Sequence, residues 1–415
     1  MNRWGLWFIS SSIAVTGLFT NAWAQTPPTE VQAPEQETVT PVFPGFPQPP
    51  AIKAKSYILI DTNTGQILAE KNATAFVEPA SLTKLMTAYL VFEALQNNSL
   101  TLDQTLQVSS RARRMEGSRM FIEENAWVSV EDLLKGMIVQ SGNDATIVLA
   151  EGVGGNVENF VASMNQKAQS LGMNNTTFMN PEGLNAPGHL TTARDLATLS
   201  MRLMQDFPQE YKYYSIKEFA YSPRPGALPI NQRNRNRLLF IDPSVDGLKT
   251  GHTSTAGYCL ISSSSKNFPN MDENRRLLSV LLGAQSDSDR TQESQKLLNW
   301  GYQAWLNVQL ITANTTIITS PVWKGASNNV NLGAAANIIA SIPQGMTDQI
   351  KTTASYTEPL LAPLTAGQRV GTLKVVLETP HGIVELGSYP LVTLEEVEEA
   401  SFLGRMWDSF RLWIK

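Results

Sequence analysis

The sequence has little of what disulfides, metal sites and nucleic-acid binding require. Its single cysteine, Cys259, excludes an intramolecular disulfide. Only three histidines occur in 415 residues, and no His/Cys/Asp cluster has the spacing of metal ligands. The formal net charge of −5 argues against a nucleic-acid-binding protein. We therefore expect no metal, no cofactor and no nucleic-acid partner.

Long apolar runs are also missing, apart from one at the N-terminus. Arg3 precedes an apolar run at residues 4–19, and residues 22–24 (Ala-Trp-Ala) have the small side chains of a cleavage site. Three serines interrupt the run, which is already short for a transmembrane helix. We predict a cleaved signal peptide at 1–24, followed by a Pro-rich, disordered or extended leader at 25–50.

The first of three short motifs is Ser-x-x-Lys at Ser81 and Lys84, which opens a helix predicted to run to about Asn97. Positions three apart lie on one face of a helix, so these two side chains can touch. A serine becomes a nucleophile when a base takes its proton. A lysine can be that base if desolvation or a neighbouring cation lowers its pKa.

Two companion motifs follow in order along the chain. Residues 141–143 are Ser-Gly-Asn after an apolar helical stretch, and residues 249–251 are Lys-Thr-Gly at the start of a strand-like run. A second Ser-x-x-Lys, at Ser263 and Lys266, lacks such companions and is interpreted as part of a polar loop. The ordered set of three is the one found in penicillin-binding proteins and class A β-lactamases.

Apolar periodicity predicts an α+β domain at 51–308, in which early and late strands share one sheet and Lys249 lies beside Ser81. A change to short β-like runs predicts a small all-β domain at 309–395. A terminal amphipathic helix is predicted at 396–415. Within the α+β domain we expect a β-hairpin from Lys55, helices near 129–140, 143–152, 156–171, 192–206 and 288–307, and strands at 245–251, 255–263 and 276–284.

With these residues in hand, the sequence resembles the serine-type D-alanyl-D-alanine carboxypeptidases, which are low-molecular-weight penicillin-binding proteins, over nearly the whole chain. Local matches include residues 140–145, 183–188, 234–236 and 245–253. The resemblance implies a β-lactamase/transpeptidase-like fold. It also implies a peptidoglycan stem peptide ending in D-Ala-D-Ala as substrate, and β-lactam antibiotics as covalent inhibitors.

The resemblance also implies roles for individual catalytic residues. Ser81 attacks the carbonyl of the penultimate D-Ala, and Lys84 takes the serine proton. Lys249 helps to hold Lys84 neutral by like-charge repulsion. Ser141 passes a proton to the departing D-Ala. Asn143 orients Lys84 and the substrate amide.

Substrate binding is implied in the same way. Thr250, His252 and Arg235 hold the terminal carboxylate, and the backbone N–H groups of Ser81 and His252 form the oxyanion hole. The substrate pairs as an added strand along Lys249, Thr250 and Gly251. Glu182 departs from the family pattern, since a neutral or imidazole side chain is expected there. Arg233 and Arg237 are interpreted as solvated surface.

The terminal segment 398–415 carries large apolar side chains at three- and four-residue steps, with Asp408, Arg411 and Lys415 on the opposite side. This pattern is typical of an in-plane interfacial helix, and the charged side can meet lipid headgroups. We expect a periplasmic enzyme tethered to the outer face of the cytoplasmic membrane. In the alternative, the same face packs on the protein.

Three other functions remain open from the sequence. A β-lactamase shares the motifs but leaves residues 309–415 unexplained. A DD-endopeptidase that cuts crosslinks is a nearer alternative, which the motifs do not exclude. A non-catalytic cell-wall-binding scaffold would have no use for a nucleophile and two lysines at these spacings.

Overall fold

The computed structural model describes residues 46–224, 226–268 and 274–414. The predicted signal peptide and residues 25–45 of the predicted leader lie outside these ranges.

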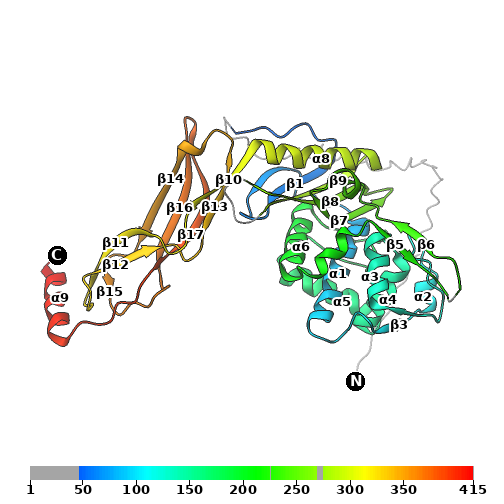
Figure 1. Cartoon of the computed structure of the whole chain (residues 1–415), viewed down its shortest axis with the longest axis horizontal. Coiled ribbons are helices and arrows are strands. Elements are labelled where there is room, and N and C mark those ends of the chain that lie inside the picture. Colours follow the sequence, from blue (N-terminus) through cyan, green and yellow to red (C-terminus); the bar gives the residue numbers. More distant parts are fainter. Residues whose placement is uncertain (1–45, 225, 269–273, 415) are drawn as a thin grey trace, which may run out of the picture. The chain divides into compact units, whose positions relative to one another are not determined.

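A five-stranded antiparallel sheet forms the centre of the N-terminal domain (Figure 1). Its order is β2-β1-β9-β8-β7, so strands from both ends of the domain meet where β1 pairs with β9. This pairing confirms the predicted α+β arrangement, and the antiparallel pairing of β1 with β2 confirms the early hairpin. The bounds are β1 Ser56–Asp61, β2 Ile67–Lys71, β7 Val245–Thr253, β8 Gly257–Lys266 and β9 Arg275–Ala284.

Alternation along β1 builds an apolar core on each face of the sheet. Ile58 and Ile60 pack against the helical region, whereas Leu59 packs with Leu297 and Leu298 of helix α8 (Asp287–Ala304). Because successive strand side chains point to opposite faces, one apolar run serves both layers. α8 ends three residues before the predicted end at 307, because Trp305 already begins a strand.

The helices expected at 129–140, 143–152, 156–171 and 192–206 are all present. The helix after Ser81 differs from its prediction. It begins as a 3-10 turn, and residues 84–92 are all buried, because the helix lies inside the helical layer. The bounds are η1 Ala80–Thr83, α1 Lys84–Gln96, α2 Ser110–Arg113, α3 Val130–Val139, α4 Asn143–Gly154, α5 Val157–Ser170, α6 Ala193–Asp206, η2 Glu210–Ser215 and α7 Leu238–Ile241. Two small two-stranded antiparallel sheets accompany them, β3 Thr105–Gln107 with β4 Trp127–Ser129, and β5 Glu218–Tyr221 with β6 Ile230–Arg233.

The second Ser-x-x-Lys lies in strand β8 and not in the predicted polar loop. Ser263 is buried, and its Oγ accepts a hydrogen bond from Arg276 Nη1 at 2.5 Å. Cys259 is buried in the same strand, where burial raises the pKa of its thiol to about 11. The prediction of a loop was wrong because the buried Ser263 hydroxyl is satisfied by Arg276 on the neighbouring strand β9, a contact that the local sequence does not indicate.

The C-terminal domain is built of strands, with one 3-10 turn, η3 (Thr347–Gln349). Six strands form a sheet of order β14-β16-β17-β12-β11-β15, and β10 pairs separately with β13. Strands β10, β13 and β15 were not foreseen, and the expected boundary at 308/309 falls inside β10. The bounds are β10 Trp305–Ile311, β11 Thr316–Trp323, β12 Asn329–Gly333, β13 Ile338–Pro343, β14 Ile350–Tyr356, β15 Leu360–Leu361, β16 Arg369–Thr379 and β17 Gly382–Thr393.

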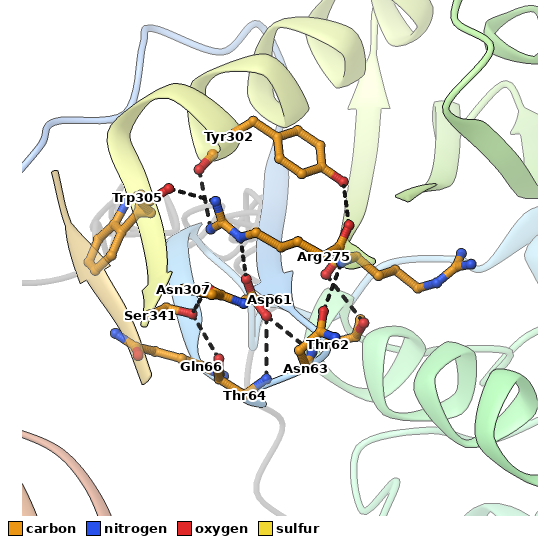
Figure 2. Close-up of polar contacts among 12 residues, drawn as sticks. Asp61, Thr62, Asn63, Thr64, Gln66, Arg275, Tyr302, Trp305, Asn307 and Ser341 are labelled. Carbon is orange, nitrogen blue, oxygen red and sulfur yellow. Dashed lines mark hydrogen bonds and ion pairs between the residues drawn. The ribbon is translucent and has the colours of Figure 1, made fainter. Parts of the chain in front are cut away.

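A buried polar cluster, the domain joint, connects the first sheet to the start of the C-terminal domain (Figure 2). Arg275 Nε donates to Asp61 Oδ2 at 2.7 Å, and Arg275 Nη1 donates to the Trp305 carbonyl at 2.5 Å. Thr64 Oγ1 lies 2.9 Å from Ser341 Oγ of β13. The side chains of Arg275 and Asp61 are both fully inaccessible to solvent.

The last described element is helix α9 (Phe402–Ile414), which has no buried residue. Its charged side differs from the prediction. Asp408 Oδ2 accepts a hydrogen bond from the backbone N–H of Lys324 at 2.7 Å, and the Arg411 guanidinium lies 5.2 Å from the Trp323 ring centre. These two residues therefore contact the C-terminal domain. No helix in the described ranges has the length and apolar character needed to cross a membrane.

Candidate active site

Ser81 lies in the tight 3-10 turn that precedes α1. The turn puts Ala80 at a positive φ of 49°, and Gly183 packs directly on it. A Cβ at Gly183 would come within 1.9 Å of the Ala80 carbonyl oxygen, so this approach requires glycine. Thr83 Oγ1 donates to the same carbonyl at 2.7 Å. The backbone around Ser81 is thus held from both sides.

Lys84 is 1% exposed, and its Nζ lies 3.1 Å from Ser81 Oγ. The same Nζ donates to Asn143 Oδ1 at 2.7 Å and to the Glu182 carbonyl at 2.5 Å. Burial, opposed by the Glu182 carboxylate and assisted by the Arg235 guanidinium, lowers the pKa of Lys84 to about 7. At neutral pH a substantial fraction of Lys84 is therefore an uncharged amine in contact with the serine.

Lys249 lies beside the second motif serine. Its Nζ donates to Ser141 Oγ at 2.9 Å and to the Thr250 carbonyl at 3.0 Å. Burial and the charge of Lys84 lower the pKa of Lys249 well below its usual value. We expected Lys249 to be the cation that lowers the pKa of Lys84. Burial is the main cause instead, and Arg235 is the added cation.

Asn143 connects Lys84 to the loop at residues 116–118, which was not predicted to be part of the site. Its backbone N–H donates to the Ser118 carbonyl at 2.7 Å, and its Nδ2 donates to the Glu116 carbonyl at 2.7 Å. Its Oδ1 therefore points at Lys84 with the amide orientation fixed. The neighbouring Asp144 is buried and accepts backbone N–H groups from residues 120–122, which holds this loop in place.

A cleft of about 950 Å³ opens above these residues. Seven of the nine predicted site residues line it, and the other two, Lys84 and Lys249, reach it through their serine partners. Arg233 and Arg237 are exposed as expected, but they also line the cleft, and Tyr258 and Arg290 are further lining residues that were missed. The seven are Ser81, Ser141, Asn143, Arg235, Thr250, Gly251 and His252.

Two buried polar residues near the site have distinct surroundings. His189 Nε2 lies 2.8 Å from Thr83 Oγ1, and its Nδ1 accepts the Met179 backbone N–H at 2.9 Å. Burial lowers the pKa of His189 to about 4, so it is a neutral structural residue at physiological pH. Glu182 is buried, and no hydrogen-bond partner of its Oε2 atom is found among the described residues. No group of His, Cys, Asp or Glu in the described ranges could hold a metal.

Comparisons with known proteins cover both domains. Residues 45–286 match the family model described as D-alanyl-D-alanine carboxypeptidase, and residues 305–399 match that of the penicillin-binding protein 5 C-terminal domain. D-alanyl-D-alanine carboxypeptidase DacC of Escherichia coli is 42% identical over 367 residues, which are 86% of this chain and 88% of the relative.

Solved structures give the same result. The crystal structure of penicillin binding protein 5 from Haemophilus influenzae matches with a TM-score of 0.76 and 38% identity, over 85% of this chain and 99% of that one. Penicillin-binding protein D2 of Listeria monocytogenes, in its ampicillin-bound form, matches with a TM-score of 0.54 and 31% identity. That match covers 60% of this chain and 98% of the other.

Proposed function

The chain belongs to the D-alanyl-D-alanine carboxypeptidase family of serine-type hydrolases, and we propose that it removes the terminal D-Ala from peptidoglycan stem pentapeptides through an acyl-enzyme on Ser81. The observation that carries this proposal is the contact between the buried Lys84 Nζ and Ser81 Oγ, 3.1 Å apart. An amine whose pKa is lowered to about 7 can accept the hydroxyl proton at neutral pH.

In the first half-reaction, Ser81 Oγ attacks the carbonyl carbon of the penultimate D-Ala while neutral Lys84 takes the hydroxyl proton. The backbone N–H groups of Ser81 and His252 stabilise the oxyanion of the tetrahedral intermediate. When the C–N bond breaks, the hydroxyl of Ser141, which lies 2.9 Å from Lys249 Nζ, gives its proton to the departing amine. The proton that Lys84 took from Ser81 replaces it, so Lys84 is neutral again for the next step. Water then hydrolyses the ester on Ser81.

Substrate binding uses the outer edge of β7, which is an edge strand of the described sheet. The substrate backbone pairs with Thr250 and Gly251 as an added strand. The guanidinium of Arg235, with Thr250 and His252, binds the terminal carboxylate. A penicillin carries an equivalent carboxylate and a reactive amide, so we propose that β-lactams acylate the same serine.

Intact mass after incubation with a penicillin tests the nucleophile. Wild-type protein should gain the mass of one penicillin, and Ser81→Ala should gain none while remaining folded. Ser263→Ala is the matched control, because Ser263 belongs to the other Ser-x-x-Lys. This substitution should leave labelling intact. Stoichiometric labelling of Ser81→Ala would overturn the assignment. Release of free D-Ala from a pentapeptide ending in D-Ala-D-Ala tests the reaction itself, and that release should survive EDTA.

We also propose that α9 tethers the enzyme to the outer face of the cytoplasmic membrane from the periplasm. Seven large apolar side chains of this helix are each more than half exposed, and two of them are tryptophans. The contacts of Asp408 and Arg411 with the C-terminal domain leave this apolar side uncovered by described residues. The seven are Phe402, Leu403, Met406, Trp407, Phe410, Trp413 and Ile414.

Cell fractionation tests the tether. Deletion of residues 398–415 should move the mature protein from the membrane pellet to the soluble fraction, with penicillin labelling retained. The double substitution Trp407→Ser and Trp413→Ser should act in the same direction. Leu228→Ser is the control, because Leu228 is 88% exposed but lies in the N-terminal domain. A truncated protein that stays in the pellet would contradict the tether.

A further inference from the structure

Three arginines at alternate positions border the cleft, and we call them the arginine row: Arg233 at the end of β6, then Arg235, and Arg237 directly before α7. All three are exposed and line the cleft. The residues between them, Asn234 and Asn236, are 6% and 1% exposed. Exposed arginines therefore alternate with buried asparagines along this part of the cleft wall.

The buried asparagines hold this register. Asn234 Nδ2 donates to the Ile216 carbonyl at 2.8 Å, and Asn236 Nδ2 donates to the Gly247 carbonyl at 3.0 Å. Asn236 Oδ1 also accepts the Leu238 backbone N–H at 3.1 Å. A shift by one residue would bury guanidinium groups and leave these carbonyls unpaired, which is strongly unfavourable. The arginine row is consequently a fixed feature of the cleft wall.

The cleft carries more positive charge than one terminal carboxylate needs. Among its described lining residues are four arginines and a single carboxylate, that of Asp287. Arg290 is mostly committed elsewhere, since it donates to the Gly251 carbonyl at 3.1 Å and pairs with Asp287. One guanidinium with hydroxyl donors suffices for a carboxylate. With Arg235 assigned to the terminal carboxylate, Arg233 and Arg237 are in excess.

Both excess arginines are available to a ligand. The guanidinium of Arg233 lies 4.0 Å from the Phe240 ring centre, and no described carboxylate pairs with it. Arg237 Nη1 lies 3.3 Å from Asp287 Oδ2, but the Arg237 side chain is 57% exposed. Such exposed pairs contribute at most about 1 kcal/mol, so a substrate anion can replace this contact.

We infer that Arg233 and Arg237 form a second anion subsite on the leaving-group side, for a departing residue whose side chain carries a carboxylate. The inference rests on the proposed function. Arg233 and Arg237 are each two positions from Arg235 and line the same cleft, so both are placed to meet such a side chain. A cleft of about 950 Å³ has room for more than the methyl group of D-Ala. Hydrolysis is unchanged: the same amide bond breaks, water adds, and an acidic residue leaves.

The test uses two isosteric peptides, diacetyl-L-Lys-D-Ala-D-Glu and diacetyl-L-Lys-D-Ala-D-Gln, which differ only in the charge of the departing side chain. For the wild-type enzyme we expect kcat/KM to be about three- to tenfold higher for D-Glu at low salt, and the ratio to shrink at high salt. The double variant Arg233→Gln/Arg237→Gln should bring the ratio close to one. Arg224→Gln is the control, because Arg224 is 69% exposed but lies outside the cleft.

Hydrolysis of diacetyl-L-Lys-D-Ala-D-Ala distinguishes a failure of the anion subsite from a failure of the proposed function. If D-Ala is released but wild type treats D-Glu and D-Gln equally, the subsite is overturned and the proposed function stands. A preference that survives in the double variant, or a variant that loses activity equally on both peptides, also overturns it. If no peptide is hydrolysed, the proposed function itself fails. The wild-type ratio requires no variant, so misfolding of the double variant leaves the test decisive.

Discussion

Two groups of ionisable side chains are buried in the N-terminal domain, and their surroundings differ. In the domain joint, the fully inaccessible Arg275 and Asp61 form an ion pair at 2.7 Å. At the candidate active site, Lys84 and Lys249 are 1% and 3% exposed. Their hydrogen-bond partners are hydroxyl, carboxamide and carbonyl oxygens, and no described carboxylate lies within ion-pair distance of either lysine.

The difference follows from what each side chain can do with its proton. An arginine stays charged in proteins, so a buried arginine requires a counter-charge and hydrogen-bond acceptors. A lysine can release its proton when burial disfavours the charged form. The domain joint therefore keeps a permanent charge for structure. The active site buries two lysines with no carboxylate in ion-pair contact among the described residues, and burial lowers their pKa values and makes one of them a base.

The largest expected effect is that of replacing the base by a permanent cation. Lys84→Arg keeps a positive charge but cannot accept the serine proton near neutral pH. We expect the second-order rate constant of acylation by a penicillin to fall about 100- to 10,000-fold. Lys249→Arg should have a milder effect, because Lys249 contacts Ser141 and not Ser81. Equal and small losses in the two variants would contradict the assignment of Lys84 as base.

In the domain joint, removing one partner should affect stability and not the chemistry. Asp61→Asn leaves Arg275 buried without its counter-charge, so we expect the free energy of unfolding to fall by about 3–5 kcal/mol. Urea denaturation measures this loss. Penicillin labelling of Ser81 in the folded protein should persist. Loss of labelling at full folded occupancy would show that the joint also acts on the site.

Two further variants sharpen the result for the joint. The double variant Asp61→Leu/Arg275→Met removes both charges, and it should be closer to wild type than Asp61→Asn, since no uncompensated charge stays buried. Glu378→Gln is the surface control, because its pair with Lys351 is 3.8 Å long and about half exposed. Its effect on the free energy of unfolding should stay below about 1 kcal/mol.

The smallest effect concerns the pH profile. Because only neutral Lys84 accepts the proton and its pKa is about 7, acylation should fall about tenfold per pH unit below 7. The Glu182 carboxylate favours the charged form of Lys84 and so raises its pKa. Glu182→Gln should therefore move the acid limb to lower pH, as measured by acylation rates between pH 5 and 8. A limb that moves to higher pH would contradict this electrostatic role.

The parts of the fold that could be predicted from the sequence are those with a local pattern. The hairpin of β1 and β2 was predicted from Lys55 onward, and apolar periodicity predicted α3 to α6. Strands β10 and β13 were missed, because each is stabilised mainly by its partner about 30 residues away. The contacts of α9 with Trp323 and Lys324 likewise depend on a distant segment.

The sequence by itself determined the reacting groups. Ser81 and Lys84 are three residues apart at the start of a helix, so their contact is a local consequence of backbone geometry. Only the tertiary structure decided the rest of the site. Long-range packing buries Lys84 and brings the Glu182 carbonyl and Asn143 into hydrogen-bond contact with its amine. It also positions the arginine row at the cleft. It also joined Asp61 to Arg275, 214 positions away. These contacts depend on long-range packing and strand register, which no local pattern in the sequence encodes.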